Sequence, residues 1–198
     1  MVIGNMNVAN TGTVVNFTSS GNTYLKSDIT VSNNGEFNLD LQNGQLIGTA
    51  SNSSGAGNIG LTLSNNMTWD MTASSQVTDL DLSDSTINFV PTLDSTLITN
   101  SLQSINGGGS FKMHVDMGAQ TGDKIIIGDS SSPLTKGSSD GAYSLVLTNN
   151  GSAATTGNEL YDVVEDYSPT ANANATFTSN TVEQGGFQYG LRTTVNGQ

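Results

Sequence analysis

The chain has 198 residues, of which only 11% are charged, 23 are glycine and none is cysteine. Seventeen acidic residues against five basic ones give a formal net charge of −12. Such a surface repels phosphate backbones and anionic lipid headgroups, so we expect no nucleic-acid partner and no binding to a membrane surface. The lack of cysteine excludes a disulfide framework and a thiolate metal site, and it suits a protein that is exported without bridges.

Short runs with apolar residues at every second position dominate the N-terminal half of the chain. A period of two predicts half-buried strands, and no stretch of about eleven residues has the periodicity of an amphipathic helix. The runs are TVVNF (13–17), EFNLDL (36–41), IGLTL (59–63), TWDMT (68–72), VTDLDL (77–82) and TINFV (86–90). We therefore expect an all-β chain.

Aromatic residues recur at a longer interval. Phe17 and Phe37 are separated by about 20 residues, as are Trp69 and Phe89. A repeat of this size, made of three short strands, indicates a β-solenoid in which each coil stacks on the last. A β-sandwich, with strands every 8–12 residues or so, is the alternative, but it gives no reason for aromatics to recur from coil to coil.

Two segments align loosely with each other in this repeat. ITVSNNGEFNLDL (29–41) and LTLSNNMTWDMTA (61–73) share an SNN turn followed by an aromatic residue. The extra spacing between them is then taken up by SNSSGAGN (51–58), which is typical of a loop.

Toward the C-terminus the apolar runs lengthen and the loops between them grow, the longest being DSSSPLTKGSSDG (129–141). The last coil of a solenoid would expose an apolar cross-section and unpaired strand edges, so a terminal cap is expected. We predict β-helix coils over 1–99, and C-terminal coils with an irregular β cap over 100–198.

The only histidine lies in the run FKMHVDM (111–117). His114 and Asp116 could act as a base and its orienting carboxylate, with Lys124 as an electrophile. Alternation, however, places His114 and Asp116 on the polar, solvent-facing side of a strand, and no nucleophile motif accompanies them. Gly122-Asp123-Lys124 is predicted to be a turn, because this lysine opens an apolar strand and not the helix that a phosphate-binding loop requires. We expect no catalysis here.

Two further kinds of site are also unfavoured. Asp79, Asp81 and Asp84 could bind a hard cation, but the Gly-Gly-x-Gly-x-Asp repeat of calcium β-rolls is missing. A polysaccharide-cleaving enzyme would need carboxylates together with Arg or Lys on one face. The basic residues are instead scattered along the chain, at Lys26, Lys112, Lys124, Lys136 and Arg192. We expect no metal, no cofactor and no enzymatic activity in this chain.

An ordered series of motifs resembles the C-terminal passenger segment of type V autotransporters, of the pertactin and diffuse-adherence adhesin kind. The motifs are GGSFKMHVDM (108–117), GDKIIIGD (122–129), YSLVLTNNGS (143–152), GNELYDVVE (157–165), ATF (175–177) and FQYGLRTTVNGQ (187–198), with TWDMTASSQVTDLDLSDSTINF (68–89) upstream. The resemblance implies a right-handed parallel β-helix with a C-terminal autochaperone-like cap, and it places GGGSFKMHVDMGAQTGDKIIIG (107–128) at the start of that cap.

The cap is expected to close the apolar cross-section with its own core. In FQYGL, alternation points Phe187, Tyr189 and Leu191 at the end of the solenoid. The full predicted cap core is Phe111, Met113, Val115, Ile125, Ile127, Leu145, Leu147, Leu160, Val163, Phe187, Tyr189 and Leu191.

The resemblance also implies a function. The chain would be part of a passenger displayed on the bacterial cell surface or secreted, acting as an adhesin or self-association module, with its C-terminal part promoting passenger folding. Its partners would be another passenger, host-cell or matrix components, and the translocator barrel of the full-length protein. The sequence stops at Gln198, before the family's linker helix and barrel, so we expect no membrane insertion of this segment. The alternative is the non-catalytic stalk and cap of an enzymatic passenger whose active domain lies upstream.

Overall fold

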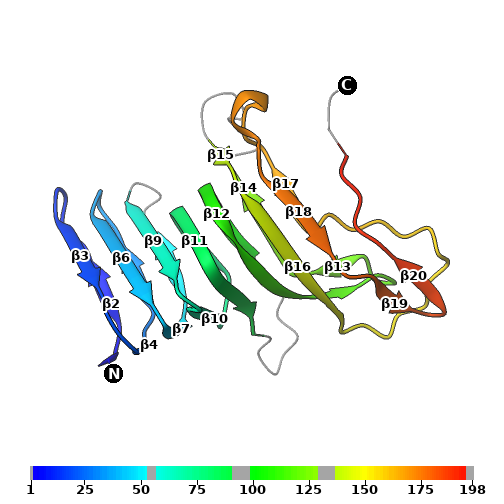
Figure 1. Ribbon diagram of the computed structural model, residues 1–198, viewed down its shortest axis with the longest axis horizontal. Coiled ribbons are helices and arrows are strands. Elements are labelled where there is room, and N and C mark those ends of the chain that lie inside the picture. Colours follow the sequence, from blue (N-terminus) through cyan, green and yellow to red (C-terminus); the bar gives the residue numbers. More distant parts are fainter. Residues whose placement is uncertain (1, 53–56, 91–98, 129–136, 195–198) are drawn as a thin grey trace.

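The chain winds into a parallel β-helix that runs from the N-terminus to a bulkier C-terminal end (Figure 1). The computed structural model describes residues 2–52, 57–90, 99–128 and 137–194. Apart from two hairpins, all paired strands are parallel. The predicted all-β solenoid is therefore confirmed. Within the described residues no helix is long and apolar enough to cross a membrane.

Three stacks of strands form the sides of the coils. The first stack contains β1 (Val2–Ile3), β4 (Thr23–Lys26), β7 (Gly44–Gly48), β10 (Thr68–Met71), the last part of β11 (Ser75–Phe89), the last part of β12 (Thr99–Asp116), β16 (Ala142–Asn149) and β18 (Thr176–Ser179). The second contains β3 (Val14–Thr18), β6 (Glu36–Gln42), β9 (Asn58–Ser64), the middle of β11 and of β12, and β15 (Ser138–Ser139).

The third stack begins with a separate sheet and continues into the C-terminal end. It contains β2 (Met6–Val8), β5 (Ile29–Val31), β8 (Ala50–Asn52), the first parts of β11 and β12, β14 (Lys124–Ile127) and β17 (Val164–Asp166). Outside the three stacks lie β13 (Thr121–Gly122), β19 (Val182–Gln184), β20 (Phe187–Tyr189) and the short 3-10 helix η1 (Thr170–Asn172).

Alternation along each strand builds the core. On the first stack Leu25 pairs with Leu46, Leu46 with Trp69, and Trp69 with Ile87, and all four side chains are 0% exposed. Burying each large apolar side chain stabilises the fold by about 1.5–3 kcal/mol. The indole Nε1–H of Trp69 donates to the carbonyl of Gly48 at 3.0 Å, so its polar atom is also satisfied.

Asparagine forms many of the corners between stacks. Asn43, Asn65 and Asn66 have φ values of 53°, 54° and 62°, in the left-handed region that asparagine tolerates better than most residues. The side chain of Asn43 donates to Asn22 of the preceding coil at 2.6 Å. Tight corners that stack on one another thus account for five of the asparagines, Asn33, Asn34, Asn43, Asn65 and Asn66.

The predicted alignment of the two SNN segments is wrong. Asn33-Asn34 form the corner between β5 and β6, whereas Asn65-Asn66 form the next corner, between β9 and β10. Phe37 accordingly pairs with Ile59 and not with a position equivalent to Trp69. Left-handed asparagine pairs suit both corners, so the turn sequence alone does not identify which one is present.

Two predicted loops are partly strand, and two predicted strands are one. In the segment 51–58, residues 51–52 belong to β8 and residue 58 begins β9, while 53–56 lie outside the described residues. In the segment 129–141, residues 138–139 form β15, while 129–136 lie outside the described residues. The runs at 77–82 and 86–90 merge into the single strand β11, whose register with β12 shifts between Ser83 and Ser85. Asp84, with φ of 50°, makes this bend.

The coils lengthen at the C-terminal end. On the first stack Ile87 pairs with Phe111, 24 residues further on, but Phe111 pairs with Leu145, 34 residues further on. Four aromatic rings link these coils: centroids lie 6.4 Å apart for Phe89–Phe111, 5.9 Å for Phe111–Tyr143 and 5.3 Å for Tyr143–Phe177. These spacings are those of favourable aromatic pairs. The aromatic ladder therefore joins the regular coils to the C-terminal end.

Candidate functional site at the C-terminal end

A buried glutamine holds the C-terminal end together. Gln184, which is 6% exposed, accepts a hydrogen bond from the Met117 N–H at 2.8 Å. Its Nε2 donates to Asp116 Oδ1 at 2.7 Å and to the Ala153 carbonyl at 2.9 Å. Its own carbonyl accepts a bond from Thr155 Oγ1 at 3.0 Å. One residue thus joins the end of β12, the segment around 153–155 and the terminal hairpin.

The hairpin that carries this glutamine follows from two glycines. Strands β19 and β20 are antiparallel, with Gln184 opposite Phe187. Gly185 and Gly186 have φ values of 60° and 85°, and two consecutive left-handed residues are what a two-residue hairpin turn requires. The turn therefore directs Gln184 back toward β12.

The histidine pairs with Asp123 and not with Asp116. His114 Nδ1 lies 3.0 Å from Asp123 Oδ2, and the same oxygen accepts the backbone N–H of His114 at 2.7 Å. Asp123 is only 4% exposed. Asp116 instead accepts bonds from Gln184 and from the Ala119 N–H, and these bonds lower the pKa of its carboxyl group.

Describing His114 and Asp116 as simple solvent-side residues was therefore wrong. Both are partly buried, and each fixes one part of the hairpin formed by β12 and β13. Among the described residues no hydroxyl group is hydrogen-bonded to His114, so the His114–Asp123 pair lacks the nucleophile of a catalytic triad. Its contacts hold the backbone in place.

Lys124 opens β14 and is held in an ion pair. Its Nζ lies 2.6 Å from Glu165 Oε1 and 5.4 Å from the centre of the Tyr161 ring. The bond from Lys124 lowers the pKa of Glu165. Burial raises the pKa of Tyr161 to about 12, and its hydroxyl donates to the Gly122 carbonyl at 2.6 Å. Lys124 thus links β14 to β17, as a positioned cation and not as a free electrophile.

Glu159 organises the segment that precedes β17. Its Oε1 accepts bonds from the Thr156 N–H and Oγ1, and its Oε2 accepts bonds from the Gly157 N–H and from the Tyr189 hydroxyl at 2.6 Å. The Tyr189 bond is the largest of the causes that lower the pKa of Glu159 to about 2. The charged carboxylate therefore fastens this segment to β20.

These carboxylates predict loosening of the C-terminal end in acid. Asp116, Glu159 and Glu165 all have pKa values below their ordinary ones, so their stabilising effect is present above an unfolded pKa of about 4 and is lost as the pH falls through the folded pKa. We expect residues 150–194 to become susceptible to pepsin as the pH is lowered from about 4.5 to about 2, while β3 to β10 stay resistant.

The matched variant is Glu159→Gln, which removes the charge and keeps the size. At neutral pH, where thermolysin takes the place of pepsin, residues 150–194 of this variant should already be cleaved faster than those of the wild type. Equal resistance of both halves at pH 2 in the wild type, after normalising to an unfolded substrate, would refute the role given to these carboxylates.

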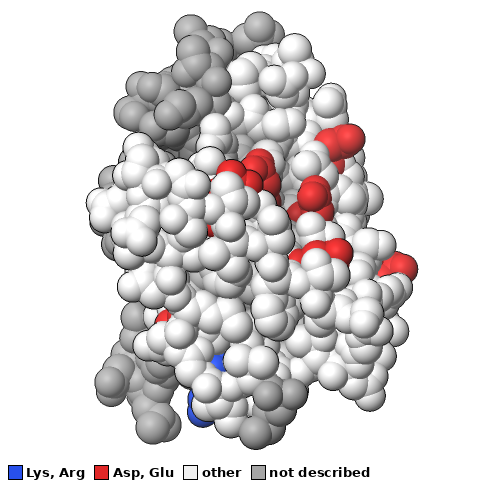
Figure 2. All heavy atoms as spheres, turned by 90° about the vertical axis from the view of Figure 1, so that its left-hand side faces the viewer, with Lys and Arg blue, Asp and Glu red and all other residues white. Residues whose placement is uncertain are grey.

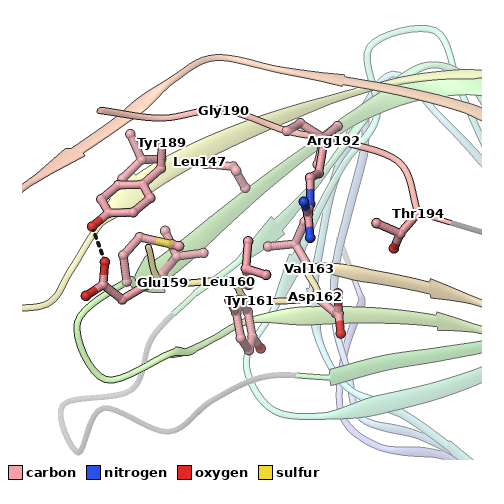
Figure 3. A pocket seen from close by; sticks show the side chains of 14 residues that line it. Leu147, Glu159, Leu160, Tyr161, Asp162, Val163, Tyr189, Gly190, Arg192 and Thr194 are labelled. Carbon is pink, nitrogen blue, oxygen red and sulfur yellow. Dashed lines mark hydrogen bonds between the residues drawn. The ribbon is translucent and has the colours of Figure 1, made fainter. Parts of the chain in front are cut away.

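A cleft of about 220 Å³ opens beside the terminal hairpin (Figure 3). Its floor consists of the core residues Val115, Met117, Val163 and Val182. The remaining lining residues are Leu147, Glu159, Leu160, Tyr161, Asp162, Tyr189, Gly190, Leu191, Arg192 and Thr194. The cleft is therefore an opening onto the apolar core that the terminal segments, as far as residue 194, leave uncovered.

The predicted cap core is placed only in part as expected. Seven of its members are buried. Six of them are at most 2% exposed, namely Phe111, Met113, Val115, Ile125, Ile127 and Leu145, and Val163 is 7% exposed. Leu147 and Tyr189 are partly buried against this core.

The prediction that Leu160, Phe187 and Leu191 are buried in the cap core is wrong, because they are 58%, 42% and 37% exposed. Strands β19 and β20 form a separate two-stranded sheet, so alternation along β20 does not decide which side chains reach the core: Tyr189 packs against it, whereas Phe187 is largely exposed. Phe187 instead packs over Gly157, where a Cβ atom would lie 2.6 Å from its ring.

The outward carboxylates on the second stack bond to neighbouring coils. Asp79 Oδ1 accepts a bond from Ser104 at 2.5 Å, and Asp81 Oδ1 accepts one from Asn106 at 3.1 Å. Seen from the N-terminal side, acidic side chains gather along one flank of the molecule (Figure 2). In the ranges that the structure describes, no group of three or more His, Asp or Glu residues could hold a metal ion.

The sequence does not predict the structural role of three residues of this site: Gln184, Asp123 and Glu159. Their partners lie elsewhere along the chain or on the backbone, as with Met117, 67 positions before Gln184. The Gly185-Gly186 pair is the one local signal, since it predicts a hairpin turn at this point.

A family model described as Pertactin matches residues 77–198. The chain belongs to the pertactin family. This pertactin-family chain is a passenger region of a type V autotransporter. It is 30% identical over 179 residues to the probable autotransporter YcgV of Escherichia coli K12, covering 88% of this chain and 18% of that protein. It is also 30% identical over 180 residues to the immunoglobulin A1 protease autotransporter of Haemophilus influenzae, covering 89% of this chain and 10% of that protein. The pertactin-family chain thus spans less than a fifth of either relative.

Proposed function

We propose that residues 99–194 act as a folding template for the coils that precede them. The observation that carries this proposal is the pairing of β12. On one side β12 pairs in parallel with β11, and on the other it pairs with β14, β15 and β16. One strand thus contributes to all three stacks, so it offers the preceding coil an edge along each of them, with one shift of register between Ser83 and Ser85.

The template overcomes the slow step of solenoid folding. Parallel pairing is slow to begin, because loop-closure entropy is lost before non-local contacts form. A coil added to an existing one gains hydrogen bonds and buried apolar area at once. The C-terminal end has its own long-range ties, such as those of Gln184 and Lys124, which support its forming first.

Two leucines on the first stack provide a matched test. Leu46 in β7 and Leu145 in β16 are both 0% exposed, and replacing either with alanine should cost about 2–5 kcal/mol. If the C-terminal end is structured in the transition state, Leu145→Ala should slow refolding at least about tenfold. Leu46→Ala should leave the refolding rate within about twofold and accelerate unfolding instead.

Stopped-flow refolding from denaturant, followed by the fluorescence of Trp69, measures both variants. Trp69 is the single tryptophan and lies in the coils, so its signal reports the part that is to be templated. Equal slowing by the two substitutions, or slowing by Leu46→Ala alone, would contradict a C-terminal template.

The outer faces are proposed to mediate adhesion or self-association, on a passenger displayed at the cell surface or secreted. Their Asn, Asp and Gln side chains form ladders, for example from Gln45 and Asn88 to Asp70. The spare polar groups of such faces suit many weak contacts with a second passenger or with host-cell and matrix components. This segment itself is proposed to be non-catalytic.

The alternative is a stalk beneath an enzymatic domain. It is favoured by the similarity to a relative whose name describes it as an immunoglobulin A1 protease autotransporter. The template role is the same in both cases. A catalytic domain in the N-terminal part of the full-length protein would favour the stalk function over adhesion or self-association.

Self-association has a distinctive salt dependence. Two chains of net charge −12 repel each other at long range, so pairing must rest on short-range hydrogen bonds. We expect dimerisation, measured by sedimentation velocity, to strengthen as salt is raised from about 0.05 M to about 0.5 M, because the Debye length shortens. Dimers that dissociate over this range would show that charge attraction drives the pairing.

A further inference from the structure

The cleft beside the terminal hairpin combines an apolar middle with charged ends. Val115, Met117 and Val182, at most 9% exposed, form part of the floor, and Leu160 and Leu191 stand at the walls with much of their side chains exposed. A large apolar side chain that entered would cover both the floor and the walls. The cleft thus offers buried apolar area to a ligand without any rearrangement of the core.

One end of the cleft is closed by a bond and the other carries two free charges. Figure 3 shows Tyr189 bonded to Glu159 at one end, and Arg192, Thr194 and Asp162 toward the other. Within the described part of the chain, neither Arg192 nor Asp162 takes part in an ion pair. A cation and an anion therefore line the same end, each available to a ligand.

We propose that this cleft binds the zwitterionic head and apolar side chain of an amino-acid-sized ligand such as phenylalanine or leucine. The side chain lies over Met117 and Val182, the carboxylate contacts Arg192, and the ammonium group contacts Asp162. This inference is independent of the template role proposed above, because neither charged residue takes part in the strand pairing.

The size of the cleft limits the ligand. Pockets for drug-sized molecules have volumes of about 300–1,000 Å³, and this one has about 220 Å³. A single amino acid fits this volume, whereas a folded domain or a long lipid does not. For a ligand of about a dozen heavy atoms in an open site we expect a Kd of about 0.1–1 mM.

The binding test follows the methyl group of Met117 by NMR in the whole chain labelled with methyl-13C methionine. Phenylalanine should shift the Met117 signal with saturation, while Met71, buried in the coils, stays unchanged. Glycine should cause no shift at the same concentration, because burying a large apolar side chain provides about a tenfold or greater gain in affinity. Absence of a shift with phenylalanine up to about 20 mM, far above the expected Kd, would overturn the proposal.

Two derivatives separate the charges and the possible sources of the ligand. N-acetylphenylalanine keeps only the carboxylate, like the C-terminal residue of a peptide, and phenylalaninamide keeps only the ammonium group, like the N-terminal residue. Each should bind about two- to fivefold more weakly than phenylalanine, the range for one exposed ion pair. If a derivative binds as tightly as phenylalanine, the zwitterion is not the ligand and the proposal fails.

Variants of exposed residues then assign each contact. Arg192→Gln should weaken phenylalanine and N-acetylphenylalanine about two- to fivefold and leave phenylalaninamide unchanged. Asp162→Asn should weaken phenylalanine and phenylalaninamide and leave N-acetylphenylalanine unchanged. Lys26→Gln and Asp40→Asn, on exposed positions of the coils, are the matched controls and should change nothing. Uniform effects of the site variants on all three ligands would overturn the assignment of the contacts.

Discussion

Replacing Gln184 with leucine is expected to unfold the C-terminal end while the coils remain folded. The substitution keeps the size of the side chain but leaves the Met117 N–H and the Ala153 carbonyl without their partner. Each buried polar group that loses its bond costs about 1–3 kcal/mol, so we expect a loss of about 2–6 kcal/mol. In a solenoid each coil contacts only its neighbours, so the loss should stay local.

Limited proteolysis together with Trp69 fluorescence measures this effect. Protease should remove the region after β12 in Gln184→Leu, while the emission of Trp69 stays that of a buried indole. The matched control is Gln188→Leu on β20, because the exposed side chain of Gln188 bonds, among the described residues, only to Glu183 at the surface. Comparable cleavage of the two variants would show that Gln184 is not what joins the three segments.

Truncating Phe111 to alanine is expected to destabilise the chain far more than truncating the exposed Phe187. Phe111 is 0% exposed and stands between Phe89 of the last regular coil and Tyr143 of the C-terminal end. Loss of its ring removes transfer free energy and leaves a cavity, which costs about 3–5 kcal/mol. The loss also interrupts the aromatic ladder, so the coils and the C-terminal end should unfold in separate steps.

Phe187→Ala is the matched control for this substitution. The Phe187 ring is 42% exposed and packs over Gly157, so its truncation should cost about 1 kcal/mol or less. Urea unfolding followed by circular dichroism compares the two. Similar losses would mean that the exposed hairpin, and not the ladder, joins the two parts.

Much of the fold is predictable because the solenoid repeats one local rule. In β6 and β9 every second residue is apolar, and those residues are the buried ones. The register of the coils is not predictable in the same way. Asn33-Asn34 and Asn65-Asn66 make similar left-handed corners at different positions in the coil. An alignment of these two turn sequences therefore matches strands that belong to different stacks.

The C-terminal end was predicted less well, for a physical reason. Alternation reports which way a side chain points relative to its own strand, but not which sheet that strand joins. Phe187 and Tyr189 have the same parity on β20, yet among the described residues β20 pairs only with β19, and Phe187 stays largely exposed. The contacts of Gln184 depend on partners some 30 and 67 residues away, and no local pattern encodes such distances.

The direct test of the template is the order in which segments become protected during refolding. Pulsed hydrogen exchange with mass spectrometry, applied to the unmodified chain, measures this order for β12 to β20, for β11 and for β3 to β10 in one experiment. We predict that amides of β12, β14 and β16 are protected first, followed by β11 and then by the coils in order toward the N-terminus. Protection that begins in β3 to β10, or that arises in all segments at once, would contradict the claim that the C-terminal end templates the coils.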